Sequence, residues 1–273
     1  MGISEELKKK LENLMAFLKQ KKVIIAFSGG VDSSLLAYLS HKYAAKTLLL
    51  IASSSLFSEK ELREATQFAE NYEIPYLIVE NEPLEDELFI ANSPNRCYLC
   101  KTILYSEMLN IKEQNDFDVI VDGTNKSELQ DYRPGFKALK ELGISIPYVD
   151  LNISKNEIRN LSKHFNLSVQ SKPPNACYAT RIAYGLKLNK DLLNKIRIAE
   201  EFLKNEYGFT QLRVRYHQGE LIRIELLKSE MFSICNKSDF QKIEEELRDL
   251  GFEYITLDIE GFRTGSMNRM INI

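Results

Sequence analysis

Two of the four cysteines, Cys97 and Cys100, form a CxxC pattern, and a third, Cys177, lies far along the chain. The pair stands near the expected start of a helix, where the helix terminus and the neighbouring Lys101 favour ionised thiolates. Clustered thiols in a reducing compartment indicate metal or redox chemistry rather than disulfides. Three thiolates suit an iron–sulfur cluster with one open iron, and we predict such a site at these three cysteines.

A structural zinc site is the alternative for these cysteines, because a lone CxxC is also half of a zinc site. Cys235 would complete a four-cysteine zinc site. However, Cys235 ends the apolar stretch MFSIC, and a buried small hydrophobic residue is the more natural interpretation there. We therefore favour the three-cysteine site over zinc.

The segment SGGVDSS, residues 28–34, lies between the apolar run KVIIAF and a helical pattern. Two glycines let the backbone approach an anion and present its N–H groups, and the following helix adds its positive end. The serine hydroxyls can donate to phosphate oxygens, and Asp32 can hold Mg²⁺ against them. A tight turn with a serine cap is the alternative, but the whole heptad in this setting favours a phosphate-binding loop.

This segment resembles the PP-loop of ATP-pyrophosphatases, which split ATP into AMP and pyrophosphate, and it does not match a Walker loop. The resemblance implies that Ala26, Phe27 and residues 53–55, beginning with Ser53, approach the nucleoside. Gly123, in the sequence DGTN after a later strand, falls on the same rim of the sheet, where a nucleotide contact and a plain turn are both open. We count Lys101 among the ATP-binding residues as well. The resemblance further implies that the pyrophosphate end of ATP is held by Ser28, Gly29, Gly30, Val31, Asp32, Ser33 and Ser34.

The elements that must position these residues alternate between strands and helices up to about residue 170. The apolar runs KVIIAF, TLLLIAS, IPYLIVE, FDVIVDG and IPYVDL predict five buried strands, and helices are expected at 4–20, 58–72, 98–114 and 152–166. This alternation predicts an α/β fold with a doubly wound parallel sheet. Helical patterns at 190–206 and 237–250 and the segments FTQLRVRYH, LIRIELL and YITLDIE then predict a small α+β unit. The expected domains are therefore 1–175 and 176–273.

Composition places the chain among ordinary globular proteins. Its 273 residues are 44% hydrophobic and 27% charged, with a formal net charge of −3. This balance gives no general polyanion-binding signal, so we expect no nucleic-acid partner. The N-terminus lacks the apolar core of a signal peptide, and no stretch approaches the roughly 20 apolar residues that span a bilayer. We therefore expect a cytoplasmic protein without a membrane partner.

The strings RCYLCK, DGTN followed by DYRPGFKAL, NACYATRIAYG, and RVRYH with RIEL together resemble the LarE family. The family comprises ATP-dependent sulfur transferases that make the nickel-pincer nucleotide cofactor of lactate racemase. The resemblance runs from the first strand into the small C-terminal unit. NACYATRIAYG is its most diagnostic string, although the family usually has serine and proline where this chain has Thr180 and Ala183.

The resemblance implies a pyridinium dicarboxylate mononucleotide substrate, whose carboxylate is adenylated and then converted by sulfur into a thiocarboxylate. In one branch of the family the residue at the position of Cys177 sacrifices its own sulfur. Members with all three cysteines resemble cluster enzymes, in which a 4Fe-4S cluster holds an extra sulfide for delivery. This chain has all three, so the expected cofactors are ATP, Mg²⁺ and a 4Fe-4S cluster, and a homo-hexamer is expected by the same resemblance.

Arginines supply the candidate site for the phosphate of this substrate. Arg213 and Arg215 stand two apart in an alternating segment, so their guanidinium groups share one face of a strand. Paired arginines bind phosphate well; a solvated strand face is the alternative, and the family resemblance favours the phosphate site. Arg181 and, with less force, Arg133 invite the same interpretation. Glu225 is expected to position an arginine or a metal, or to pair near Arg223.

Three other functions compete with sulfur transfer to a mononucleotide. A tRNA-thiolating PP-loop enzyme can also combine a CxxC, a distant cysteine and a cluster, but the chain shows no RNA-binding module. An amide-forming synthetase of the same fold would use ammonia and would not need the cysteines. A non-enzymatic metal-binding module would not need the phosphate loop.

Overall fold

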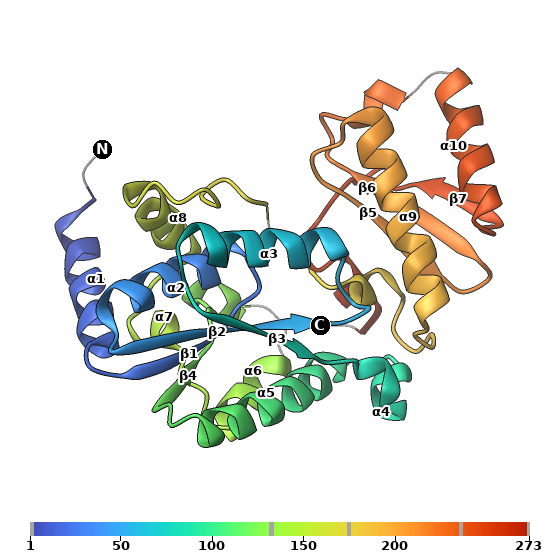
Figure 1. Ribbon diagram of the computed structural model, residues 1–273. Coiled ribbons are helices and arrows are strands. Elements are labelled where there is room, and N and C mark those ends of the chain that lie inside the picture. The colour runs from blue at the N-terminus through green and yellow to red at the C-terminus, as the bar shows by residue number, and fades with distance from the viewer. Residues whose placement is uncertain (1–2, 131–133, 174–175, 235–236, 272–273) are drawn as a thin grey trace. The chain divides into compact units, whose positions relative to one another are not determined.

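The computed structural model describes residues 3–130, 134–173, 176–234 and 237–271. Contacts divide the chain into two units (Figure 1): the first comprises residues 1–83 and 97–175, and the second comprises residues 84–96 and 176–273. Residues 84–96 fall within the predicted first domain, 1–175, but belong to the second unit. The chain therefore passes between the units three times, after residues 83, 96 and 175.

The first unit is built on a parallel sheet of four strands in the order β3-β2-β1-β4. β1 pairs in parallel with β2 and β4, and β2 pairs in parallel with β3. This arrangement confirms the predicted doubly wound parallel sheet. The strands are β1 (Lys22–Ala26), β2 (Lys46–Ser53), β3 (Tyr76–Glu80) and β4 (Val119–Val121).

Helices cover both faces of this sheet (Figure 1), because alternate side chains of each strand point to opposite faces. Val23 and Ile25 of β1 pack with the helices of one face, and Ile24 between them packs with the helices of the other. A strand buried on both faces appears in the sequence as a continuous apolar run, as KVIIAF does. The first face carries α1 (Glu5–Leu18), α2 (Val31–Tyr43), α3 (Glu59–Asn71) and α8 (Lys155–His164); the second carries α5 (Arg96–Gln114) and α6 (Pro134–Glu141).

One predicted strand is wrong. IPYVDL forms the short helix α7 (Pro147–Asp150), and only Ser145 before it bridges β4, at Val121. Pro147 is the first residue of the helix, where its fixed φ and missing N–H are well tolerated, whereas in a ladder it could donate no hydrogen bond. The turn of helix buries Tyr148 completely, and its hydroxyl donates to the carbonyl of Asp32 at 3.1 Å.

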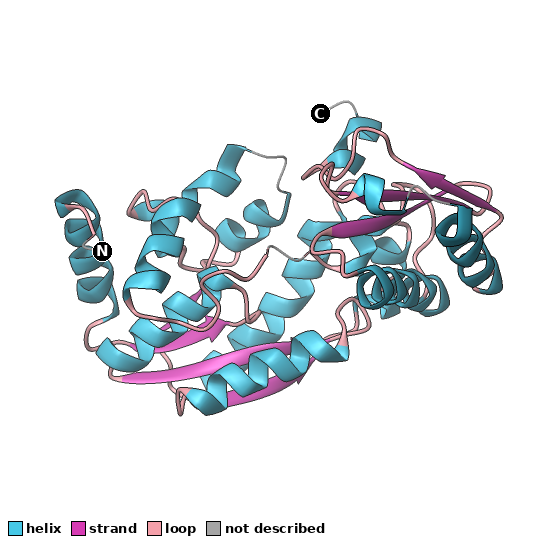
Figure 2. Cartoon of the chain, turned by 90° about the horizontal axis from the view of Figure 1, so that it is seen from above, coloured by secondary structure: helices cyan, strands magenta, loops and turns pink. Residues whose placement is uncertain are grey.

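The second unit is the predicted small α+β unit (Figure 2). Its sheet pairs β5 (Leu212–His217) antiparallel to β6 (Leu221–Leu226), and β6 parallel to β7 (Tyr254–Leu257). Helices α4 (Glu87–Ile90), α9 (Lys190–Tyr207) and α10 (Lys237–Asp249) accompany it. Among the described residues of both units, the 3₁₀ turns are Pro83–Glu85, Lys126–Gln130, Tyr178–Arg181, Met231–Ile234 and Ser266–Ile271.

In the described ranges, no helix combines the length and the apolar character that crossing a bilayer requires.

Removing a central side chain of the larger sheet should test this core. Ile25 is fully buried, so Ile25→Ala should lower the free energy of unfolding by about 2–5 kcal/mol. Leu77, on the edge strand β3, is 46% exposed, and Leu77→Ala should change the free energy by less than about 1 kcal/mol. Urea unfolding of the two variants measures the difference; equal losses would contradict the packing described.

Candidate active site

The SGGVDSS segment forms a tight loop between β1 and α2. Gly29 has φ +65°, and a Cβ at this position would lie 3.2 Å from the Cα of Ala65 on α3. Only glycine meets both conditions, because the left-handed backbone is strained for other residues. Gly30 is the N-cap of α2 and has no side chain that could cap the helix. The first-turn amides therefore suit an anion, as predicted.

The serines of the loop differ in what they can offer a phosphate. Ser28 is exposed, and its hydroxyl lies 3.2 Å from the hydroxyl of the buried Ser33, which also donates to the carbonyl of Gly30 at 3.2 Å. Ser34 is completely buried, and its hydroxyl has no hydrogen-bond partner among the described residues. The loop therefore presents the Ser28 hydroxyl, whereas the Ser34 side chain lies in the core.

The residues expected near the nucleoside offer it mainly backbone groups, because their side chains are buried or small. The side chain of Phe27 is buried against Phe68, with ring centroids 5.4 Å apart. Val31 is buried as well. Ala26 and Ser53, at the carboxyl ends of β1 and β2, are half-buried.

Gly123, after β4, packs directly on the start of α2. A Cβ at Gly123 would lie 3.1 Å from the amide nitrogen of Ser33 and 3.3 Å from the carbonyl carbon of Asp32. The absence of a side chain therefore keeps the first turn of α2 accessible from the rim of the sheet. This close approach makes Gly123 part of the loop's surroundings and not a distant turn.

Asp32 is held by cationic and amide groups that the sequence analysis missed. Lys155, the first residue of α8, forms an ion pair with its carboxylate, and the Asn125 amide donates to the same carboxylate at 3.3 Å. A lysine in the first turn of a helix opposes the helix dipole, and nothing in the local sequence connects Lys155 to Asp32. To hold the predicted Mg²⁺, this carboxylate would have to exchange its contact with Lys155 for the metal.

Cys97 and Cys100 lie in the first turn of α5, where residues three apart share one face of the helix. Both are half-buried. Gly135 of α6 lies against this turn, because a Cβ there would be 3.0 Å from Cδ of Lys101 and 3.3 Å from the carbonyl oxygen of Cys97. The predicted helix start at the CxxC is confirmed.

A buried carboxylate ties the CxxC turn to the rim of the phosphate loop. Lys101 Nζ lies 2.9 Å from the carboxylate of Asp122, the residue before Gly123, and the Tyr105 hydroxyl donates to the same oxygen. Burial alone would raise the pKa of Asp122, but Lys101, the Thr124 hydroxyl and Tyr105 outweigh it and hold that pKa at about 2. Burial, with the Asp122 charge second, raises the pKa of Tyr105 well above its ordinary value.

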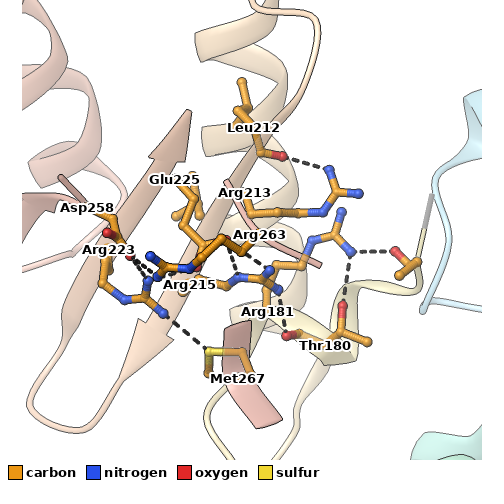
Figure 3. Close-up of polar contacts among 12 residues, drawn as sticks. Thr180, Arg181, Leu212, Arg213, Arg215, Arg223, Glu225, Asp258, Arg263 and Met267 are labelled. Carbon is orange, nitrogen blue, oxygen red and sulfur yellow. Dashed lines mark hydrogen bonds and ion pairs between the residues drawn. The ribbon is translucent and has the colours of Figure 1, made fainter. Parts of the chain in front are cut away.

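The second unit carries a buried arginine cluster (Figure 3), which we define as Arg181, Arg213 and Arg215. Arg181 donates to both carboxylate oxygens of Glu200, at 3.0 and 3.1 Å. Arg215 donates twice to Glu225, at 3.1 and 3.0 Å. Arg213 donates to the Leu212 carbonyl at 2.7 Å and lies 5.3 Å from the centroid of the Phe262 ring. All three arginines are buried, which excludes the solvated strand face.

The carboxylates beside this cluster are shared among several arginines. Glu225 is shared with Arg223, at 2.7 Å, which also pairs with Asp258. Burial, with the charge of Arg181 second, lowers the pKa of Arg213 to about 10. Burial is also the first cause that lowers the pKa of Arg215. Buried guanidinium groups gathered in this way can bind an anion such as phosphate.

Cys177 is the N-cap directly before the 3₁₀ turn Tyr178–Arg181. Its carbonyl accepts from the Thr180 amide at 3.0 Å, from the Thr180 hydroxyl at 2.8 Å and from Arg181 Nη1 at 3.2 Å. A serine hydroxyl, usual in the family at this position, could make the same contact as Thr180. The amide of Ala183 donates to the Tyr216 carbonyl at 2.9 Å, which the family's usual proline could not do.

The three predicted cluster ligands stand on two units, Cys97 and Cys100 on the first and Cys177 on the second. Among the side chains that the structure describes, no three histidines, cysteines or carboxylates form a group that could hold a metal ion. Convergence of the three thiols therefore stays a prediction. Cys235 and Arg133 lie outside the described residues. His217 accepts a hydrogen bond from Arg223 Nε at 3.3 Å.

Comparison with known proteins decides the family. The family model described as NAD synthase matches residues 3–180. A protein of Lactiplantibacillus plantarum, pyridinium-3,5-bisthiocarboxylic acid mononucleotide synthase, is 31% identical over 95% of this chain and 94% of its own length. The chain belongs to the LarE family, within the PP-loop proteins of the NAD synthase type. It is an enzyme of the ATP-pyrophosphatase type that binds ATP and Mg²⁺.

Other relatives give the range of this similarity. An uncharacterized protein of Synechocystis is 34% identical over 97% of this chain and 99% of its own length. A tRNA-specific 2-thiouridylase of Ehrlichia canis is 28% identical over 58% of this chain and 53% of its own length. Similarity to the LarE-family protein thus extends into the unit with the arginine cluster, whereas similarity to the tRNA enzyme covers little more than half of the chain.

Asp122→Asn should test the link between the CxxC turn and the rim. The pKa of Asp122 in the fold, about 2, lies below the ordinary value of 3.8, so its ionised form stabilises the fold by about 2 kcal/mol near neutral pH. That contribution is fully present above about pH 5 and is lost as the pH falls toward 2. Urea unfolding should show the variant about 2 kcal/mol less stable at pH 7, with the gap narrower by about 1 kcal/mol at pH 3.

The exposed carboxylate of Asp249 on α10 provides the control. Asp249→Asn should show a free energy of unfolding within about 0.5 kcal/mol of the parent at both pH values. A gap for Asp122→Asn that is the same at pH 7 and pH 3 would contradict the role given to the ionised carboxylate.

Proposed function

We propose that this LarE-family enzyme adenylates a carboxylate of pyridinium-3,5-dicarboxylate mononucleotide and converts it into a thiocarboxylate, as a step toward a nickel-pincer nucleotide. The observation that carries the proposal is the arginine cluster beside Cys177: one turn of chain bears both a thiol and Arg181, which contacts the Cys177 carbonyl. A buried anion site next to a sulfur nucleophile suits a phosphorylated substrate that accepts sulfur. The name of the Lactiplantibacillus plantarum relative supports the same product class.

The reaction divides into two balanced steps. In the first, a carboxylate oxygen of the substrate attacks the α-phosphorus of ATP, and pyrophosphate leaves to give an acyl adenylate. In the second, a sulfur nucleophile attacks the acyl carbon, and AMP leaves with the former carboxylate oxygen. The phosphate loop serves the first step, because its amides and the Ser28 hydroxyl stabilise the leaving pyrophosphate. The arginine cluster orients the substrate through its phosphate.

Cys97, Cys100 and Cys177 are proposed to hold a 4Fe-4S cluster. Two of them already share one helical face, which fits two thiolate ligands of one cluster. Cys177 is the second residue after the chain passes into the second unit at residue 176. Cys97 is the first residue after the chain returns to the first unit. When bound, such a cluster supplies an open iron that can keep sulfide for delivery. Sacrifice of the Cys177 sulfur itself is the alternative within the same function.

Chain connectivity supports the proximity of the thiols. Arg96, bonded to Cys97, belongs to the second unit, where it donates to Asn92 at 2.5 Å. Asn92 in turn donates to the carbonyls of Ala183 and Leu186, at 2.9 and 3.0 Å. The residue before Cys97 is therefore tied, through Asn92, to the segment 183–186, which follows Cys177 in the sequence.

Serine variants of the cysteines should separate adenylation from sulfur delivery. Wild-type protein purified without oxygen should contain about four iron atoms per chain and absorb broadly in visible light. Cys97→Ser, Cys100→Ser and Cys177→Ser should each lose most of the iron. They should also lose thiocarboxylate formation, while release of pyrophosphate from ATP with the mononucleotide stays within about threefold of wild type, because the phosphate loop is intact.

Cys235→Ser is the matched control and should keep both iron and activity. A colourless, zinc-loaded wild type would contradict the cluster. Sulfur transfer with normal iron content in Cys177→Ser would contradict the assignment of Cys177. Thiolation of bulk tRNA in place of the mononucleotide would favour the tRNA-thiolating alternative, and product formation from ammonia would favour an amide synthetase.

Arg213→Met should weaken substrate binding more than it slows chemistry. Loss of a charge-assisted contact to phosphate should raise KM for the mononucleotide about 10- to 100-fold with kcat nearly unchanged. Arg197→Met is the control, since Arg197 lies on α9 and pairs with Glu201 of its own helix. Steady-state kinetics with inorganic phosphate as a competitor measures both. A fall in kcat at constant KM would contradict a phosphate site at Arg213.

A further inference from the structure

The phosphate loop has a cationic contact on its outer side. Lys172 Nζ lies 3.0 Å from the carbonyl oxygen of Gly29 and 2.8 Å from a carboxylate oxygen of Glu64 on α3. Lys172 also lines a surface groove of about 610 Å³ beside the loop, together with Lys60, Glu64 and other residues of α3. Lys172 lies outside both sequence motifs that identified the site, the SGGVDSS segment and the CxxC pattern.

This contact bears on the anion-binding side of the loop through the geometry of one peptide. The carbonyl of Gly29 and the N–H of Gly30 belong to the same planar trans peptide, so they point in opposite directions. A cation that holds the Gly29 carbonyl outward therefore turns the Gly30 N–H inward, where the N-cap amide of α2 can meet a phosphate. Gly29 and Gly30 have the freedom to rotate otherwise.

Lys172 is itself held in place by α8. Arg159 donates to the carbonyls of Gln170 and Lys172, at 2.9 and 3.0 Å. Arg159 is one turn along the helix from Lys155, which pairs with Asp32 at the other end of the loop. Two cations of one helical face thus reach the phosphate loop, Lys155 directly and Arg159 through the segment 170–172. This segment leads in five residues to Cys177.

We propose that Lys172 is a positioning residue for the phosphate loop, which fixes the Gly29–Gly30 peptide for pyrophosphate and makes anion binding depend on the anchored segment 170–172. The inference rests on the proposed use of the loop for ATP. A surface ion pair between Lys172 and Glu64 alone would be worth little, and its two partners would then be equivalent. With Lys172 as a positioning cation, loss of Lys172 weakens anion binding and loss of Glu64 strengthens it. The effects are opposite because Glu64 withdraws the charge that Lys172 presents to the loop.

The test compares binding of Mg²⁺ with α,β-methylene-ATP, which cannot be split at the α–β bond, to the full-length chain by calorimetry. Lys172→Met should raise Kd about five- to tenfold, and Lys172→Arg should recover most of the loss. Glu64→Gln should lower Kd about twofold. Arg159→Met, which removes an anchor but no loop contact, should raise Kd about threefold. In the double variant with Lys172→Met, Arg159→Met should raise Kd little further than Lys172→Met does alone.

Lys60→Met is the matched control, because Lys60 is an exposed lysine of the same groove, and its Kd should equal that of wild type. Thermal unfolding checks that each variant is folded. Equal weakening by Lys172→Met and Glu64→Gln would overturn the proposal in favour of a plain ion pair, and so would an unchanged Kd for Lys172→Met. A wild type that binds no analogue would overturn the ATP-dependent function as well, whereas normal wild-type binding with insensitive variants overturns this proposal alone.

Discussion

Parallel pairing of β1 with β2 and β4 is the constraint on which the site of the first unit depends. Parallel strands bring their carboxyl ends to one edge of the sheet, so the phosphate loop, the end of β2 and Asp122-Gly123 meet there regardless of their distance in sequence. The missing side chain of Gly123 then lets the rim approach the first turn of α2, within 3.1–3.3 Å of where a Cβ would stand. Asp122, one residue earlier, binds Lys101 and so brings the CxxC turn to the same edge.

Electrostatics in the second unit has a different character. Arg181 and Glu200 form a closed, fully buried pair, and such a pair contributes little net stability because both charges are desolvated. Arg213 and Arg215 lie beside this pair, and burial is the first cause that lowers the pKa of each. A protein that only needed a stable core would do better with apolar side chains here.

Sequence patterns predicted the elements well wherever the signal was local. Apolar runs identified β1 to β4, and the Ser58–Glu61 capping box identified the start of α3. The pattern failed at IPYVDL, because an apolar run of that length does not distinguish a strand from a turn of helix around Pro147. The alternation of Arg213 and Arg215 showed that they share a face, but not that the face is buried; burial depends on α9 and the 3₁₀ turn, which lie elsewhere in the sequence.

The residues that sequence reasoning missed share one physical property. Lys155 meets Asp32 and Lys172 meets Gly29 across more than a hundred residues of chain, so no local spacing reveals them. A loop of small residues has no cation of its own, and pyrophosphate carries several negative charges. The fold therefore brings lysines to the loop from α8 and from the segment before the last chain crossing. The glycine-serine motif is local and could be recognised in the sequence, whereas these two lysines reach the loop only through the fold and could not.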